Sequence, residues 1–215
     1  MKKTILLLSL VLLLLPAAVF SGEVFSLGVG SINQVQVDPF HPDTQIASLI
    51  DVHNWATGGE IRASLLNVNL EGYVLIQQGE IIDVTESGMP VFADDIAQRL
   101  FGMVALGFST EVASCTTLSL AAGSLIGLDV RQNFTGLFWM GDQDNVYSAA
   151  RWDEFYQNIV LAYRARLDLN LGNFSLGLHY QVPSQGYSVA YHETQALIPD
   201  WSQGKLGFSF ITKFL

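Results

Sequence analysis

The residues of this chain that could carry catalysis are few, and their spacing favours no reaction. The histidines are His41, His53, His179 and His192, and serine and aspartate are common throughout the sequence. A nucleophile, a general base and a residue that orients the base must meet in space, and no spacing here singles out such a triad. We therefore predict that the protein is not an enzyme and has no catalytic residues.

Metal and redox chemistry find as little support in the sequence. Residues 141–145 read Gly-Asp-Gln-Asp-Asn, but they lack the full spacing and the later bidentate glutamate of a calcium loop. Cys115 is the only cysteine, so the chain has no intrachain disulfide. We expect no metal ion and no bound cofactor.

The charged residues outside the longest connections follow a pattern with a period of two. Between residues 159 and 171, Arg164, Arg166 and Asp168 alternate with apolar residues such as Leu167. Successive side chains of a β-strand point to opposite faces, so this segment has one polar face and one apolar face. A helix would mix the two sets of residues. The segment is therefore predicted to be a strand.

The same alternation recurs along the chain and predicts eight strands. They fall near residues 23–32, 55–65, 68–77, 99–109, 115–130, 157–171, 174–183 and 205–215. Between residues 55 and 77 the phase of the alternation shifts by one residue. Either a β-bulge or a tight turn at Leu66-Asn67 explains the shift, and we favour the turn because it completes a regular layout.

Short and long connections alternate strictly between these strands. The short turns lie near Asn67, at 110–114 and at Gly172-Asn173. The long connections are roughly 33–54, 78–98, 131–156 and 184–204. Outer-membrane barrels have short periplasmic turns, longer extracellular loops and an even number of strands. In hydrocarbon only helices and closed barrels pair every backbone polar group. We predict an all-β, eight-stranded antiparallel up-and-down transmembrane barrel.

The N-terminal segment and the composition agree with export to a membrane. Two lysines precede an apolar run at 5–15, and small residues follow as far as Ser21. This pattern predicts a signal peptide at 1–21 and a barrel domain at 22–215. An uncleaved anchor is the alternative, although the run is shorter than the roughly 20 residues of a spanning helix. Charged residues make up only 14% of the chain, against roughly 25% in ordinary soluble domains.

The layout resembles that of small bacterial outer-membrane barrels, namely the OmpA transmembrane domain, OmpX and OmpW. This resemblance implies a final strand that the barrel-assembly machinery recognises. Gly207, Phe208, Phe210 and Phe214 match such an assembly signal. The match departs from the usual form at the end, where Leu215 follows the last aromatic residue and Thr212 takes a hydrophobic position. The implied location is the bacterial outer membrane, and the expected partners are its lipid and the assembly machinery.

Two groups of charged residues bear on function. If polar faces line the lumen, a charge cluster results that comprises Glu60, Arg62, Glu71, Asp129, Arg164, Arg166 and Asp168. An unpaired charge in a narrow interior is costly, so we expect these side chains to pair and to close the lumen. The long connections are acidic and contain Asp38, Asp43, Asp51, Glu80, Asp83, Glu86, Asp94, Asp95, Asp142, Asp144, Asp153, Glu154, Glu193 and Asp200.

Three functions remain open at this point. We favour a non-catalytic, monomeric surface barrel that acts through its acidic loops on an extracellular ligand, or as a structural membrane protein. The alternatives are a narrow channel or carrier for small hydrophobic molecules, as in OmpW-like proteins, and a soluble periplasmic barrel like a lipocalin. Nucleic acid is not an expected partner, because Asp and Glu number 20 against 10 Lys and Arg.

The membrane assignment predicts heat-modifiable gel migration. Folded protein extracted in detergent should migrate anomalously until it is heated, because a closed ladder of backbone hydrogen bonds resists the gel detergent. Electrophoresis with and without boiling measures this directly. A protein that dissolved as a monomer without detergent would instead support the soluble barrel.

Overall fold

A computed structural model describes residues 25–85, 88–92, 96–132, 138–140, 160–184 and 197–214. The side chains of residues 96, 128–132 and 138–140 lie outside this description. The predicted signal peptide at 1–21 also lies outside it and remains a prediction.

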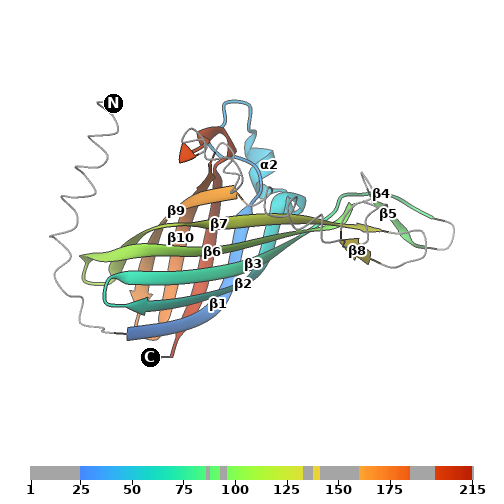
Figure 1. The fold of residues 1–215 in the computed structure, drawn as a ribbon. Coiled ribbons are helices and arrows are strands. Elements are labelled where there is room, and N and C mark those ends of the chain that lie inside the picture. The colour runs from blue at the N-terminus through green and yellow to red at the C-terminus, as the bar shows by residue number, and fades with distance from the viewer. Residues whose placement is uncertain are drawn as a thin grey trace, which may run out of the picture.

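Eight long strands of the described chain close into a barrel (Figure 1). They are β1 (Phe25–Val35), β2 (Trp55–Leu65), β3 (Val68–Gln78), β6 (Ile96–Ala113), β7 (Thr116–Gln132), β9 (Val160–Leu171), β10 (Phe174–Pro183) and β11 (Lys205–Lys213). Every neighbouring pair is antiparallel. β1 pairs with β11, and β6 pairs with both β3 and β7, so every one of the eight strands has two neighbours. The predicted fold class is confirmed.

The short turns all lie at one end of the barrel. Leu65 pairs with Val68 across the two-residue turn at Leu66-Asn67, so the region from 55 to 77 is two strands, as favoured. Phe174 likewise pairs with Leu171 across Gly172-Asn173. The expected turn at 110–114 was too early and too long: β6 continues to Ala113 and the turn is Ser114-Cys115. A bulge between Glu111 and Ala113 lets the ladder continue through this polar stretch.

The long connections carry short elements of their own. They are α2 (Ile46–Ile50), the 3-10 turn η1 (Val52–Asn54), the hairpin of β4 (Ile81–Val84) with β5 (Pro90–Phe92), β8 (Phe138–Met140) and η5 (Trp201–Gln203). β8 pairs with the end of β7, outside the ring of eight. In Figure 1, β6 and β7 run past the barrel wall towards β4, β5 and β8. The long connections are therefore partly strand and partly helical turn.

The outer face of the barrel is apolar and the inner face is largely polar. Residues of the apolar phase each expose more than half of their surface: Ile61, Leu70, Val74, Val104, Leu106, Phe108, Leu178 and Phe208. Buried residues of the opposite phase include Glu60, Asn69, Glu71, Ser119, Arg164, Arg166, Asp168 and His179. A soluble barrel needs the reverse arrangement, so the lipocalin-like alternative is wrong. An apolar exterior with every strand paired suits hydrocarbon.

The described helices are too short or too polar for any of them to cross a bilayer.

Leu66 occupies a backbone conformation that glycine adopts more easily. Its φ is 54°, and it is the only non-glycine residue with a positive φ in the described part of the chain. Replacing it by glycine (Leu66→Gly) should raise the free energy of unfolding by about 1 kcal/mol, because the strained left-handed conformation costs roughly that much. Urea unfolding of the barrel in lipid vesicles measures the change.

The neighbouring Leu65 provides the matched control. It is similarly exposed but lies in extended strand backbone. Leu65→Gly should lower the free energy of unfolding, since glycine weakens a strand. If both substitutions destabilised the barrel equally, strain at Leu66 would not be the cause.

Candidate functional site

The candidate site is a cluster of six charged side chains in the middle of the lumen. Glu60 and Arg62 come from β2, Glu71 from β3, and Arg164, Arg166 and Asp168 from β9. Each strand places them at alternate positions, so all six point inward. All six are inward charges that the sequence pattern predicted, and the cluster joins strands that are far apart in the chain.

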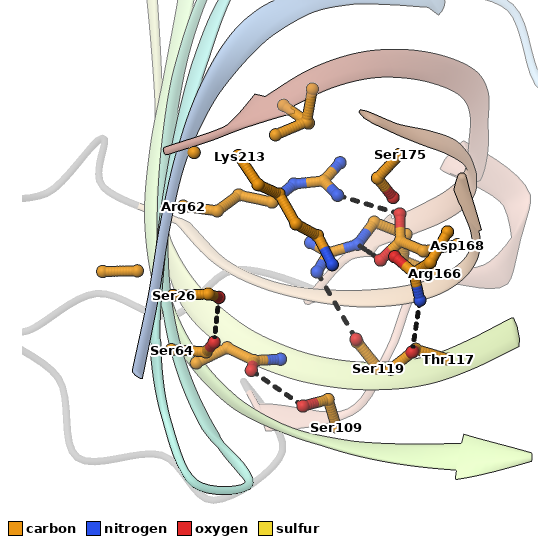
Figure 2. A pocket seen from close by; sticks show the side chains of 15 residues that line it. Ser26, Arg62, Ser64, Ser109, Thr117, Ser119, Arg166, Asp168, Ser175 and Lys213 are labelled. Atoms are coloured by element: carbon orange, nitrogen blue, oxygen red, sulfur yellow. Dashed lines mark hydrogen bonds and ion pairs between the residues drawn. The ribbon is translucent and has the colours of Figure 1, made fainter. Parts of the chain in front are cut away.

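Arg62 connects β2 to the opposite wall of the barrel (Figure 2). Its Nη1 donates a hydrogen bond to Asp168 Oδ1 at 2.8 Å. Its Nη2 donates to Glu60 Oε2 at 2.9 Å and to Ser209 Oγ on β11 at 2.5 Å. One guanidinium therefore holds together side chains of β2, β9 and β11.

Arg164 is fully buried and is held by two carboxylates and an aromatic ring. Its Nη1 lies 2.9 Å from Glu60 Oε1 and 3.7 Å from Glu71 Oε1. Its guanidinium carbon also lies 5.3 Å from the centre of the Tyr73 ring. None of its three guanidinium nitrogens makes a hydrogen bond to a described residue. The charge is thus compensated by proximity to carboxylates and by a cation–π contact rather than by well-aligned hydrogen bonds.

Arg166 lies between two carboxylates, Asp168 and Glu71, and binds both. Its Nε donates to Asp168 Oδ2 at 2.7 Å, and its Nη1 donates to Glu71 Oε2. Its Nη2 reaches Ser119 Oγ on β7 at 3.4 Å, a contact that Figure 2 also shows. Three arginines thus face three carboxylates, and the formal charges of the cluster cancel.

The seventh predicted member of the cluster is Asp129. The register of β6 and β7 places it opposite Arg99, towards the loop end. Its side chain lies outside the part of the chain that the structure describes. The structure therefore brings six of the seven predicted residues together.

The residues of the predicted assembly signal lie on β11 and just after it. Phe208 and Phe210 point outward, and their rings lie 5.6 Å from Trp55 and 5.4 Å from Phe174 between centroids. Phe214 is exposed and follows the strand. Gly207 points inward, where a Cβ atom would lie 2.5 Å from His179 Nε2. Packing against His179 therefore requires a glycine at this position, independently of its predicted role in assembly.

An apolar layer next to the charge cluster was missed by the sequence analysis. Buried Ile32, Leu75 and Met103 pack there with Tyr73. The Tyr73 hydroxyl donates to Gln181 Oε1 at 2.6 Å. All of these residues are in the inward phase of their strands, so the alternation itself was the signal. The prediction considered the charged inward residues and overlooked the large apolar ones.

The lumen contains two separate cavities with these buried layers between them. The cavity on the turn side has a volume of about 80 Å³ and is lined by polar groups that include Ser26, Ser64, Asn170 and Lys213 (Figure 2). The cavity on the loop side has a volume of about 310 Å³ and is lined by Gln181 and Lys205 among others. Fully buried side chains such as Arg164 and Leu75 fill the space between the two. The middle of the lumen is therefore closed.

Nothing in the described cluster suits metal chemistry. In the part of the chain that the structure describes, no three His, Cys, Asp or Glu side chains are arranged to hold a metal ion. The three carboxylates of the cluster are already paired with arginines. His179 is buried, and neither of its ring nitrogens has a hydrogen-bond partner among the described residues.

Eight strands, closure, an apolar exterior and long loops at one end now define the architecture. The chain has the layout of a small outer-membrane barrel. No protein-family model matches it. No curated protein matches its sequence either.

Several solved structures of small barrels are similar to the chain. One is Ail, the attachment invasion locus protein of Yersinia pestis, solved in complex with the heparin analogue sucrose octasulfate. Its identity is 15%, the match covers 88% of this chain and 97% of Ail, and the TM-score is 0.45. Neisserial surface protein A is 10% identical over 89% of this chain and 98% of its own, with a TM-score of 0.45. Outer membrane protein H of P. aeruginosa is 14% identical over 88% and 99%, with a TM-score of 0.42. At these values nothing about a ligand carries over to this chain.

Removing one carboxylate from the cluster should destabilise the barrel strongly. Glu60→Gln keeps the shape of the side chain but leaves three buried arginines facing two carboxylates. Uncompensated buried charge of this kind costs about 3–5 kcal/mol, which should appear as a lower free energy of unfolding in lipid vesicles.

Glu111→Gln is the control, because Glu111 is an exposed carboxylate near the turn end of β6. That change should alter the free energy of unfolding by no more than about 0.5 kcal/mol. Equal effects of the two substitutions would show that the charge cluster does not contribute specially to the stability of the barrel.

Proposed function

We propose that the protein is a non-catalytic integral outer-membrane barrel that acts through the acidic surface of its long loops. The observation that carries this proposal is the closed lumen. Because neutralised charges and an apolar layer fill its middle, the interior offers solutes no continuous path. The loop end is then the part of the protein that is left to meet other molecules.

The described loop segments contain six carboxylates. Within residues 36–54, 79–85, 88–92 and 197–204, the carboxylates are Asp38, Asp43, Asp51, Glu80, Asp83 and Asp200, and these segments contain no Lys or Arg. Hydrogen bonds from the His53 backbone N–H and ring lower the pKa of Asp51. The Ser202 hydroxyl and backbone N–H do the same for the pKa of Asp200. Both groups therefore keep their negative charge below the usual range of aspartate.

Large apolar side chains lie beside these carboxylates. Phe40, Ile46, Ile50 and Val52 in the first loop are each more than two thirds exposed, and Trp201 is 66% exposed. A surface that mixes negative charge with apolar side chains favours a partner with the complementary character, which is a basic and amphipathic polypeptide. Simple solvation of the loops accounts for the carboxylates but not for the exposed apolar residues.

The channel or carrier for small hydrophobic molecules finds less support. Such a route needs an apolar or wet path along the whole lumen. The middle of this lumen holds six mutually paired charged side chains, of which Arg164 and Glu60 are fully buried. A barrel that serves only as structural membrane protein remains compatible with the same closure and differs by the absence of a loop partner.

Binding to a cationic polypeptide tests the proposal. Protein in nanodiscs of zwitterionic lipid should bind oligolysine at low salt. Neutralising three loop carboxylates together (Asp38→Asn, Asp43→Asn, Asp51→Asn) should weaken binding about fivefold or more, and added salt should weaken it further. Fluorescence anisotropy of labelled oligolysine measures both effects.

Glu111→Gln again serves as control, since it removes a carboxylate from the opposite end of the barrel and should leave binding unchanged. Binding that the triple variant retained in full would count against the acidic loops. Discrete conductance steps in a planar bilayer, lost on substitution of Arg164 or Arg166, would support the channel in place of this proposal.

A further inference from the structure

The cavity on the loop side of the lumen has the features of a binding site. It opens beneath the loops and has a volume of about 310 Å³, at the lower end of the range for small-molecule pockets. Its lining comprises Leu125, Val160, Gln181, Pro183, Ser184, Asp200, Gln203 and Lys205. Leu125, Val160, Gln181 and Lys205 are inward residues of four different strands, so the rigid barrel wall forms most of the site.

Lys205 places a cation at the wall of this cavity. Its Nζ donates to Gln36 Oε1 at 2.7 Å and lies 4.8 Å from the centre of the Phe101 ring. None of the described carboxylates lies within ion-pair distance of it. An ammonium group has three donors, so two remain for a ligand. An amide and a ring do not neutralise the charge, and an anion would.

Ser184 adds a second polar group to the same cavity. Its backbone is held by a hydrogen bond from its N–H to the Leu161 carbonyl at 2.6 Å and by a β-bridge to Pro199. The side chain is buried, with 4% of the residue exposed, and its Oγ has no hydrogen-bond partner among the described residues. A buried hydroxyl without a partner costs free energy, which a bound acceptor would recover.

The one carboxylate in the lining is already engaged elsewhere. Asp200 accepts hydrogen bonds from Ser202 Oγ at 2.6 Å and from Gln203 Nε2 at 2.8 Å. These bonds stabilise η5, and within the described residues Asp200 forms no ion pair with Lys205. The floor of the cavity is Gln181, whose amide oxygen is bound by Tyr73 above the closed middle of the lumen. A molecule that enters from the loop end cannot continue through the barrel.

We propose that this cavity binds a small amphiphilic anion, namely a carboxylate or sulfonate with a short apolar chain. The anionic head lies between Lys205 Nζ and Ser184 Oγ, and the chain packs against Leu125, Val160 and Pro183. Such a site makes the barrel a receptor with a blind pocket at its mouth. The proposal is independent of the binding of basic polypeptides to the loops, and either can fail without the other.

Titration with sodium hexanoate tests the proposal. The protein is isotopically labelled and embedded in nanodiscs of zwitterionic lipid, so that only amide signals of the barrel are observed. Hexanoate should produce saturable shifts at residues around the cavity, such as Ser184 and Gln203. Hexylamine, which has the same chain and the opposite charge, should produce none. Equal saturable shifts with hexylamine or hexan-1-ol would overturn the anion preference, and no saturable shift with hexanoate would overturn the site.

Two variants and one control locate the anion. Lys205→Met should weaken hexanoate binding about tenfold or more, because it removes a charge-assisted contact and keeps the apolar stem. Ser184→Ala should weaken it about threefold and provides an independent test if Lys205→Met does not fold. Lys213→Met changes the other lysine on the inward face of β11, next to the turn-side cavity, and should bind as the wild type does. Unchanged affinity in both Lys205→Met and Ser184→Ala would contradict the assignment.

Discussion

Three arginines and three carboxylates share the middle of a narrow lumen, and none of them is compensated by a single partner alone. Glu60 lies within ion-pair distance of all three arginines, and Arg166 in turn lies within that distance of Glu60, Glu71 and Asp168. Moving any one of these charges out of register would leave another unpaired in a poorly hydrated interior, at a cost of about 3–5 kcal/mol, a large fraction of the net stability of a domain. The cluster therefore specifies how β2, β3 and β9 must be placed relative to one another.

The rest of the interior is organised around that cluster. Tyr73 bridges its charged and apolar surroundings, since its ring faces Arg164 and its hydroxyl binds Gln181. Gly207 is small because the His179 ring occupies the space where its side chain would lie. On the outside, the same strands present a continuous apolar surface, which is rare on a protein exposed to water. The buried charges are therefore stable only inside a closed barrel, and the apolar exterior is stable only in lipid.

Closure also separates the two ends of the molecule. The turn end carries a small polar cavity and short hairpins, while the loop end carries carboxylates, exposed apolar side chains and a larger cavity with a cation in its wall. Since the lumen does not connect them, chemistry at one end is independent of chemistry at the other. This division is the basis on which we propose recognition at the surface rather than transport.

The amino-acid sequence alone determined which side chains of each strand point inward, where most strands begin and end, and that a turn lies at Leu66-Asn67. These features depend on the strict period of two and on local turn chemistry, which a single segment already contains. Tertiary structure alone decided which inward residues meet. Arg62 and Asp168 are 106 positions apart in the chain and come together only because closure and strand stagger bring β2 opposite β9. The same holds for the apolar layer at Ile32 and Leu75, for the cavity that Lys205 and Ser184 both line, and for the strands within the loops, because each depends on partners that no local pattern specifies.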